Sequence, residues 1–329
     1  MIKLTNNPII SIVIPVYNDQ NVLDELFLNL DNQTLDNDLY EIIFVNDGST
    51  DSSEYKIANY IKEKDNCSLF NQINLKQAEA RNHGIREARG KYVMFIDSDD
   101  SFDSDYLYVM YQNIGDDVIF SNIEKIFPNG NHVKERSIFA NDENKNDRLI
   151  GDYLSKGTEV DNGVWANLYN LKFLNDNHIQ FENSNFFEDS LFNLKVLVNV
   201  NPSKISYLDY YGYKLVKHNE TTTNSFSPNL YGLLLSYINK TGDLLKNKEI
   251  KLNKNVYRGF VVRQFIYLLH HYIKFSDYSS SLNINKNIKF KDAFNSKLPR
   301  KYKLAVFLIK FMFPVYFIIY KYSYKLKYS

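Results

Sequence analysis

The sequence contains few of the residues that build disulfide-rich, collagen-like or low-complexity chains. Its 329 residues include 1 cysteine, 12 glycines, 7 prolines and 1 tryptophan. The single cysteine, Cys67, cannot form an internal disulfide, which fits a reducing compartment such as the cytoplasm. With 44% hydrophobic and 24% charged residues, the composition is that of a globular protein and excludes wholesale disorder.

A net charge is absent as well. The chain has 39 basic and 39 acidic residues, whereas a generic nucleic-acid binder carries a basic excess, so we expect no nucleic-acid partner. The first residues, MIKLTNNPIISIVIP, show no basic start followed by an apolar stretch and a small-residue cleavage site. We therefore expect no secretory signal and a cytoplasmic location.

The balance of charge hides a basic C-terminal segment. From Lys297 to the end there are seven lysines, one arginine and no acid. Residues 304–320 are apolar except for Lys310, and Pro314 interrupts them. This run is shorter than the roughly 20 apolar residues that a spanning helix needs. We expect residues 298–329 to lie in a membrane interface; a core or oligomer-forming helix and a spanning helix remain alternatives.

The first hundred residues alternate strand and helix patterns, which predicts an α/β fold with a mostly parallel sheet covered by helices on both faces. Continuous apolar runs predict buried strands, and apolar residues at helical spacing predict helices between them. Beyond residue 100 the pattern is less regular, and it becomes helical from residue 228 to 271. The predicted strands are 9–16, 40–45, 68–73 and 92–96, and the predicted helices are 21–30, 54–64 and 77–88.

Polar residues follow three of these strands, where ligands of such sheets bind. They begin at Tyr17, at Asn46 and at Asp97. Two carboxylates two residues apart, Asp97 and Asp99, can share a hard divalent cation and a diphosphate. Asp47 can accept a hydrogen bond from a nucleobase or ribose, or can simply turn the chain and cap the next helix.

Three other places carry candidate functional groups. Arg81 lies on the helix before the acidic strand and can pair with acids or phosphate, or can face solvent. Glu188 and Asp189 open a helix, where a carboxylate serves as a cap or as a general base. His218 lies in a polar loop as a metal or phosphate ligand, or as a surface residue.

Taken in order along the chain, these segments resemble the family 2 glycosyltransferases of the bacterial cell-surface polysaccharide type, which have the GT-A fold. The resemblance implies a Rossmann-like mixed sheet flanked by helices over residues 1–225. Residues 1–100 would be the nucleotide-sugar half and 101–225 the acceptor half, with a helical C-terminal region over 226–329. The segments that carry the resemblance are Ser11–Asn18, Val45–Asp51, Ala80–Ile85, Ala88–Val93, Phe95–Asp100, Val164–Trp165 and Glu188–Asp189.

The resemblance also implies a reaction and its residues. It implies inverting transfer from a nucleotide sugar, usually a UDP-sugar, assisted by Mn²⁺ or Mg²⁺ bound through Asp99. Asp189 would take the proton from the acceptor hydroxyl, with support from Glu188. The nucleotide sugar would be held by Pro15, Tyr17, Asp47, Arg81, Asp97, Ser98 and Trp165. One departure stands out, because Lys76 occupies a position where the family commonly has glycine.

We expect a glycan or polyprenyl-diphosphate-linked acceptor, as in capsule, exopolysaccharide or teichoic-acid synthesis. The basic tail would make the enzyme peripheral on the inner face of the cell membrane, and a homo-oligomer is possible. The alternatives are a non-catalytic nucleotide-sugar-binding scaffold and a nucleotidyltransferase. The latter should have a glycine-rich basic loop after the first strand, where this chain has Tyr17-Asn18-Asp19-Gln20.

Overall fold

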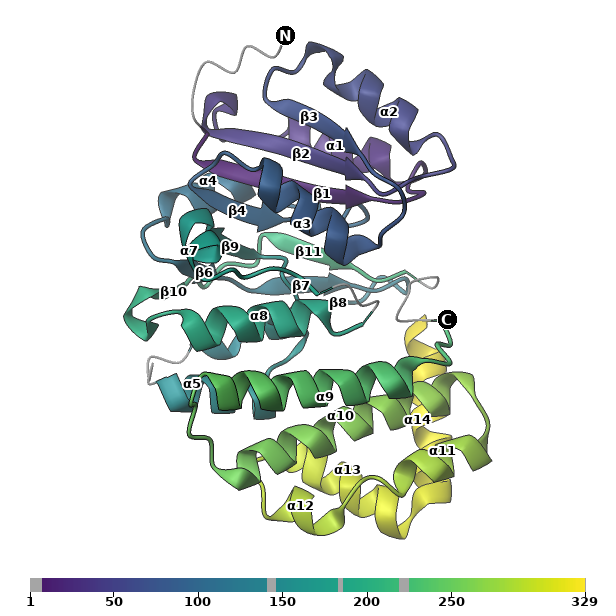
Figure 1. Cartoon of the computed structure of the whole chain (residues 1–329). Helices are drawn as coiled ribbons and strands as arrows, with labels where there is room; N and C mark the ends of the chain where they lie inside the picture. The colour runs from purple at the N-terminus through teal and green to yellow at the C-terminus, as the bar shows by residue number, and fades with distance from the viewer. Residues whose placement is uncertain (1–7, 141–145, 183–185, 219–224, 329) are drawn as a thin grey trace. The chain divides into compact units, whose positions relative to one another are not determined.

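The computed structural model describes residues 8–140, 146–182, 186–218 and 225–328. The chain divides into two compact units (Figure 1). The first comprises residues 1–125, 133–143 and 158–216, and the second comprises residues 126–132, 144–157 and 217–329.

A seven-stranded mixed sheet forms the centre of the first unit. Its strands lie in the order β10-β6-β9-β4-β1-β2-β3. Strands β4, β1, β2 and β3 are parallel, whereas β9 runs antiparallel to both β4 and β6. This arrangement confirms the predicted α/β class. The strands are β1 (Ile10–Val16), β2 (Tyr40–Asn46), β3 (Cys67–Asn71), β4 (Tyr92–Phe95), β6 (Val118–Phe120), β9 (Asn167–Asn170) and β10 (Ile205–Tyr207).

Every residue of β1 and β2 is buried, because helices cover both faces of the sheet. Ile12 and Ile14 point into a core shared with α1 and α4. On the opposite face Ile43 and Val45 pack with Ala80 of α3. Burial on both faces explains why nearly all residues of these two strands are apolar; the buried polar residues Ser11 and Glu41 hydrogen-bond to each other. The helices of this unit are α1 (Leu23–Asp31), α2 (Ser53–Tyr60), α3 (Gln77–Glu87), α4 (Tyr106–Gln112), α6 (Glu159–Asn162), α7 (Leu171–Asp176) and α8 (Glu188–Asn199).

Helix α3 lies unusually close to the sheet at Gly84. A Cβ atom at this position would lie 2.2 Å from Cγ1 of Val13 on β1. The helix therefore packs on β1 at this distance only because the residue has no side chain. This close contact holds α3 against the sheet and so positions Arg81, which lies about one turn before Gly84 on the same helix.

A second, four-stranded sheet lies in the order β5-β11-β7-β8. Strands β7 and β8 form a hairpin that turns at Gly130 with φ of 77°. The helix α5 (Asn146–Lys156) was not predicted. The strands of this sheet are β5 (Ser101–Phe102), β7 (Ile123–Ile126), β8 (His132–Glu135) and β11 (Tyr213–Val216).

The C-terminal region is helical, as predicted, and α10 contacts most of the other helices in the second unit. The basic segment forms two helices rather than one, since the backbone breaks at Met312 just before Pro314. Within the described residues, no helix is long and apolar enough to cross a membrane. The helices are α9 (Leu230–Asn247), α10 (Lys254–Phe275), α11 (Tyr278–Asn285), α12 (Phe290–Phe294), α13 (Arg300–Phe311) and α14 (Phe313–Tyr328).

Candidate active site

The polar ends of three parallel strands meet at one edge of the large sheet. In the register of the sheet, Val16 at the end of β1 pairs with Asn46 at the end of β2. Strand β4 pairs with β1 on its other side. The residues that follow these strands, Tyr17, Asp47 and Asp97, therefore lie along the same edge, as the sequence predicts.

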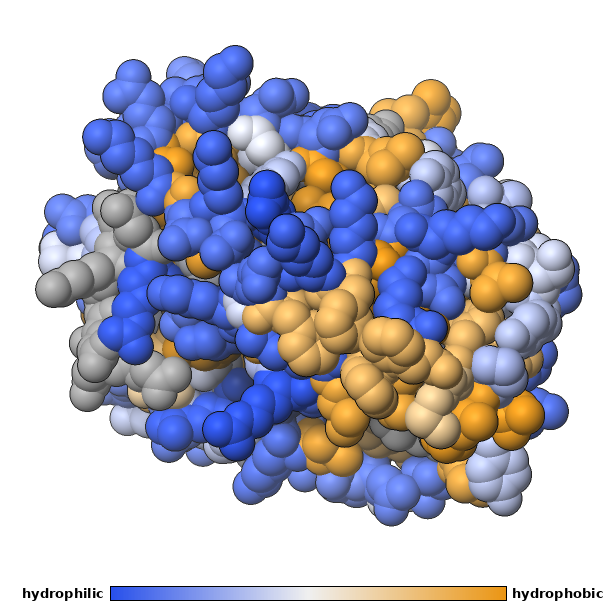
Figure 2. All heavy atoms as spheres, turned by 90° about the horizontal axis from the view of Figure 1, so that it is seen from below, coloured by the Kyte–Doolittle hydropathy of each residue, from blue (hydrophilic) through white to orange (hydrophobic). Residues whose placement is uncertain are grey.

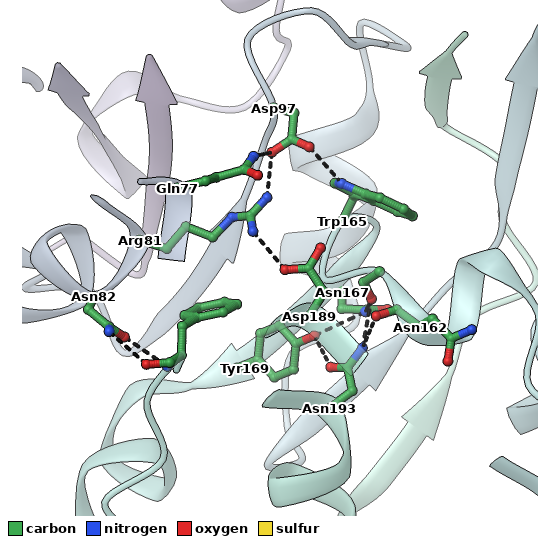
Figure 3. A network of polar contacts seen from close by, with 12 residues as sticks. Gln77, Arg81, Asn82, Asp97, Asn162, Trp165, Asn167, Tyr169, Asp189 and Asn193 are labelled. Atoms are coloured by element: carbon green, nitrogen blue, oxygen red, sulfur yellow. Dashed lines mark hydrogen bonds and ion pairs between the residues drawn. The ribbon is translucent and has the colours of Figure 1, made fainter. Parts of the chain in front are cut away.

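A buried arginine joins two acids at this edge. The side chain of Arg81, on α3, is 1% exposed. Its Nη2 donates to Oδ1 of Asp97 and its Nη1 donates to Oδ1 of Asp189, each at 2.7 Å (Figure 3). Burial lowers the pKa of Arg81, but attraction to the two carboxylates more than offsets this and raises it above its ordinary value. The guanidinium therefore stays charged and holds both acids in place.

Three donors from two segments, helix α3 and the Trp165 segment, hold the carboxylate of Asp97. Besides Arg81, its carboxylate accepts from Nε1 of Trp165 at 2.9 Å and from Nε2 of Gln77 at 3.0 Å. The backbone N–H of Asp97 donates to the hydroxyl of Tyr213 at 3.3 Å. These contacts bring Trp165, which the sequence placed near the sugar or acceptor, next to the acid that follows β4.

Asp47 is buried, and its carboxylate anchors the loop before α3. It accepts from Nε2 of Gln72 and from the backbone N–H groups of Leu75 and Lys76, all at 2.8 Å. A carboxylate has about four acceptor positions, so one remains for a further donor. Tyr17, across the edge, is 46% exposed.

The first turn of α8 carries the second acidic pair. Burial raises the pKa of Asp189 to about 6, although Arg81 acts against this rise. Burial and then repulsion from Asp189 raise the pKa of Glu188 to about 8. Oε2 of Glu188 is buried and has no hydrogen-bond partner among the described residues. The two neighbours thus differ, since the pKa of Glu188 is raised further than that of Asp189, which has the cation of Arg81 beside it.

Asn193, behind the acidic pair, joins α8 to the segment that carries Trp165. Asn193, one turn after Asp189 on α8, is fully buried and donates to the carbonyl of Gly163 at 2.7 Å. Its Oδ1 accepts from the hydroxyl of Tyr169 at 2.7 Å. A Cβ on Gly163 would lie 2.0 Å from the ring of Trp165, so the indole packs directly on this glycine. Helix α8 and the Trp165 segment are therefore fixed to each other (Figure 3).

Several residues at this edge have strained backbones. Four non-glycine residues with positive φ each stand next to a predicted site residue or at the start of α3: Asn18 (57°), Lys76 (76°), Ala166 (57°) and Phe187 (68°). Such conformations are unfavourable for residues with a side chain and are concentrated at functional sites. Their clustering supports the location of the site independently of the acids.

The remaining predicted residues lie as follows. Pro15 is buried inside β1, and Asp99 is half-buried after β4. The hydroxyl of Ser98 donates to Oδ2 of Asp19 at 2.6 Å. His218 is half-buried two residues after β11 and belongs to the second unit.

The described residues contain no group of three or more His, Cys, Asp or Glu side chains able to hold a metal by themselves. That finding is compatible with Mg²⁺ or Mn²⁺, which enzymes commonly bind through one or two carboxylates together with substrate phosphates. Asp99, two residues after Asp97, is the carboxylate that the resemblance assigns to such an ion. Its oxygen donor set is the right chemistry for either cation.

Sequence reasoning overlooked two members of the network. Asp19 accepts from Ser98 and from the backbone N–H of Tyr17, and burial raises its pKa. Gln77 joins the start of α3 to Asp97. The position of Asp19, two residues beyond Tyr17 at a strand end, could have indicated it, whereas nothing in the sequence singles out Gln77.

The chain is similar in sequence to several curated proteins with assigned names. The chain is 29% identical over 303 residues to the cholesterol galactosyltransferase of Borreliella burgdorferi, covering 88% of this chain and 81% of that protein. It is 32% identical over 256 residues to the poly(ribitol-phosphate) beta-glucosyltransferase of Bacillus spizizenii, covering 74% of this chain but 38% of that protein. It also spans 50% of the putative glycosyltransferase EpsH of Bacillus subtilis, at 31% identity over 53% of this chain.

The fold has solved counterparts. The crystal structure of Staphylococcus aureus TarS 1–349 in complex with UDP-GlcNAc matches with a TM-score of 0.64 and 20% identity, over 96% of this chain and 91% of that one. This likeness confirms the GT-A fold. The sequence profile described as Glycosyl transferase family 2 matches residues 11–176, just over half of the chain. The chain belongs to glycosyltransferase family 2.

Proposed function

We propose that this glycosyltransferase moves a sugar from a UDP-sugar to a hydroxyl group of a glycan or lipid-linked glycan, with inversion at the anomeric carbon. The observation that carries the proposal is the ion pair of Arg81 with both Asp97 and Asp189. It places the acid that follows β4, where the nucleotide sugar would bind, beside the candidate base. Asp97 follows β4 at the strand ends where ligands of such sheets bind, and Asp189 in the first turn of α8 is held beside it through Arg81.

The nucleotide would bind along the ends of β1, β2 and β4. Tyr17 offers an exposed ring beside Pro15, and Asp47 keeps one acceptor position for a nucleobase N–H. Ser98 and Asp97 follow β4 next to them, toward the ribose and diphosphate. The UDP and UDP-GlcNAc complexes of TarS support a uridine nucleotide, because their protein has the same fold.

Asp99 would hold Mn²⁺ or Mg²⁺, and the bound ion would neutralise charge on the departing diphosphate. Arg81 does not take this part, since its two Nη groups already hold Asp97 and Asp189. His218 stays a candidate metal or phosphate ligand on the sequence argument alone. His218→Ala tests it through the Mn²⁺ concentration needed for half-maximal activity.

The acid–base step would belong to Asp189. Its carboxylate takes the proton of the acceptor hydroxyl while that oxygen bonds to the anomeric carbon, and the bond to the nucleotide breaks with its electron pair leaving on the diphosphate. Arg81 holds one oxygen of Asp189 and so directs the other. Glu188, protonated beside it, would form a hydrogen bond with the sugar through its buried carboxyl.

The acceptor and location are proposed from the relatives and the C-terminal segment. The poly(ribitol-phosphate) glucosyltransferase suggests a cell-surface polymer such as teichoic acid, and capsule and exopolysaccharide remain possible. The cholesterol galactosyltransferase acts on a lipid by its name and matches over most of both chains. Both support an acceptor presented at a membrane, with the enzyme peripheral on the inner face; a homo-oligomer is compatible with this.

Release of free nucleotide tests the proposal. The protein is incubated with UDP-, GDP- and dTDP-sugars, with Mn²⁺ or with EDTA. We expect UDP release from one donor, lost with EDTA and with Asp99→Ala. The matched control is Asp65→Ala, which removes an exposed acid before β3. Release that persists in EDTA and in Asp99→Ala would refute the metal role, and failure to bind any nucleotide would refute the function.

A further inference from the structure

Helices α13 and α14 each have two different apolar faces. On α13, Val306 and Ile309 are buried within the helical unit. On α14, Tyr316 forms a 2.6 Å hydrogen bond with Nε2 of His270, and Tyr320 stacks on the same imidazole with ring centroids 3.8 Å apart. The inner face of α14 therefore packs on α10 through aromatic rings that carry polar groups.

The outer faces are apolar and exposed. Large apolar residues recur every three or four positions along both helices, which places them in one stripe on each. Each is between 43% and 66% exposed. Apolar residues gather on the face of the molecule that Figure 2 shows. The stripes consist of Leu304, Phe307, Phe311 and Met312, followed by Val315, Ile318, Ile319, Tyr322 and Leu326.

This arrangement departs from the usual one, because apolar residues lie on both the inner and the outer sides of the helices. A helix on a water-exposed surface turns its apolar side inward and its polar side outward. Here the inner side of α14 includes tyrosines, whereas its outer side includes Ile318, Ile319 and Leu326. Single exposed apolar residues are ordinary, but a contiguous patch with a polar border marks an interaction site. The outer stripes therefore need an apolar partner.

The charge of the segment identifies that partner. Residues 297–329 contain eight basic residues and no acid. Arg300 and Lys301 are exposed where α13 begins, and Lys325 is exposed in the last part of α14. Lys310 differs, because it donates to the carbonyl of Asn285 at 2.7 Å and burial lowers its pKa. The cations thus gather at the ends of the apolar stripes.

We propose that the outer faces of α13 and α14 lie in the interface of a bilayer that contains anionic lipids. The stripes enter the boundary of the acyl chains, and the flanking lysines and arginine contact the headgroup phosphates. Each basic residue near such a surface adds about a fivefold gain in affinity. A second copy of this chain is disfavoured as the partner, because pairing two identical faces brings two sets of cations together without an acid between them.

This inference identifies the surface behind the proposed peripheral location and does not depend on the transfer reaction. The test is flotation of the full-length protein with two kinds of vesicle. One contains phosphatidylcholine alone, and the other contains phosphatidylcholine with about 30% phosphatidylglycerol, an anionic lipid. We expect flotation with the anionic vesicles, and much less with neutral vesicles or at high salt.

Two double variants separate the apolar and the charged contributions of the surface. Ile318→Gln/Ile319→Gln removes exposed apolar area, and Lys301→Glu/Lys325→Glu reverses flanking charge. Each should reduce partitioning at least about tenfold. The matched control is Leu28→Gln on α1, which changes a leucine that is 61% exposed in the first unit and should bind as the native protein does.

Three results would overturn the inference. The first is that the native protein does not float with anionic vesicles, and the second is that Ile318→Gln/Ile319→Gln floats as well as the native protein. The third is that the native protein binds no vesicles but forms a dimer in solution, and this variant is monomeric. UDP release is measured on the same samples. Vesicle binding without nucleotide release or binding would refute the proposed function and leave the surface, and the reverse result would refute the surface alone.

Discussion

Replacement of Lys76 by glycine should stabilise the first unit. Lys76 has φ of 76° and ψ of 164°, a backbone region that is essentially restricted to glycine. A side chain in that region costs about 1–3 kcal/mol. Glycine loses about 0.5–1 kcal/mol through its more flexible unfolded state. The difference predicts a gain of about 0.5–2 kcal/mol for Lys76→Gly. The exposed lysine side chain contributes little to this balance.

The measurement is urea unfolding followed by fluorescence of Trp165, the single tryptophan, which lies in the same unit. The slope should stay constant while the midpoint rises. Lys76→Ala is the matched control, because it removes the same side chain but keeps the Cβ atom that causes the strain; we expect it to leave the midpoint unchanged. If Lys76→Ala stabilised as much as Lys76→Gly, or if Lys76→Gly destabilised the unit, the reasoning from backbone strain would be wrong.

Four further predictions concern the site itself. Asp189→Asn should keep UDP binding and reduce transfer by about 10²–10⁴-fold, and the native rate should fall as pH drops through about 6, where Asp189 becomes protonated; an unchanged rate would remove it as the base. Arg81→Met should lower the free energy of unfolding by about 3–5 kcal/mol, because it leaves two partly buried carboxylates without their cation; urea unfolding measures this, and a loss under about 1 kcal/mol would contradict it. Because the pKa of Glu188 is raised to about 8, its stabilising contribution is present below its ordinary pKa and is lost as pH rises through about 8. At about pH 9, one unit above this pKa, Glu188→Gln should therefore be more stable than the native protein by about 1 kcal/mol or more. The difference in stability should shrink toward about pH 5, near the ordinary pKa of glutamate. A difference that stays constant with pH would speak against the raised pKa. Gly163→Ala should displace the ring of Trp165 and lower transfer, which a change in tryptophan fluorescence would accompany; native fluorescence and activity would show that the ring does not depend on this glycine.

The strands and the strand ends could be predicted because their signals are local. The run over residues 9–16 is apolar except for Ser11 and is followed by polar residues, which is the pattern of a strand that is buried on both faces and ends at a solvent edge. Asp47 and Asp97 follow from the same reasoning, since parallel strands bring their carboxyl ends to one edge. The unusual conformation at Lys76 was also foreseeable, because glycine is common there in the family and the backbone adopts the conformation that glycine permits.

The partners of these residues could not be predicted, because they depend on packing between distant segments. Arg81 and Asp189 are 108 residues apart, and Trp165 and Asp97 are 68 residues apart. The hydrophobic periodicity of the sequence predicts helices but does not predict that α8 contacts α3. For the same reason the sequence left Arg81 open between a site residue and a solvated helix face, and the contact of Asp47 with the loop at Leu75 and Lys76 was not foreseen.

The adjacent acids Glu188 and Asp189 show how position alone gives two identical functional groups different states. Three carboxylates, with Asp97, surround one guanidinium, so full ionisation would leave an excess of negative charge in a largely buried cluster. Successive residues on a helix point about 100° apart, and only Asp189 reaches Arg81, at 2.7 Å. The acid beside the cation keeps its negative charge and can accept a proton. The acid whose Oε2 has no partner among the described residues takes up a proton instead. Which of the two residues faces Arg81 therefore decides which one has the smaller rise in pKa.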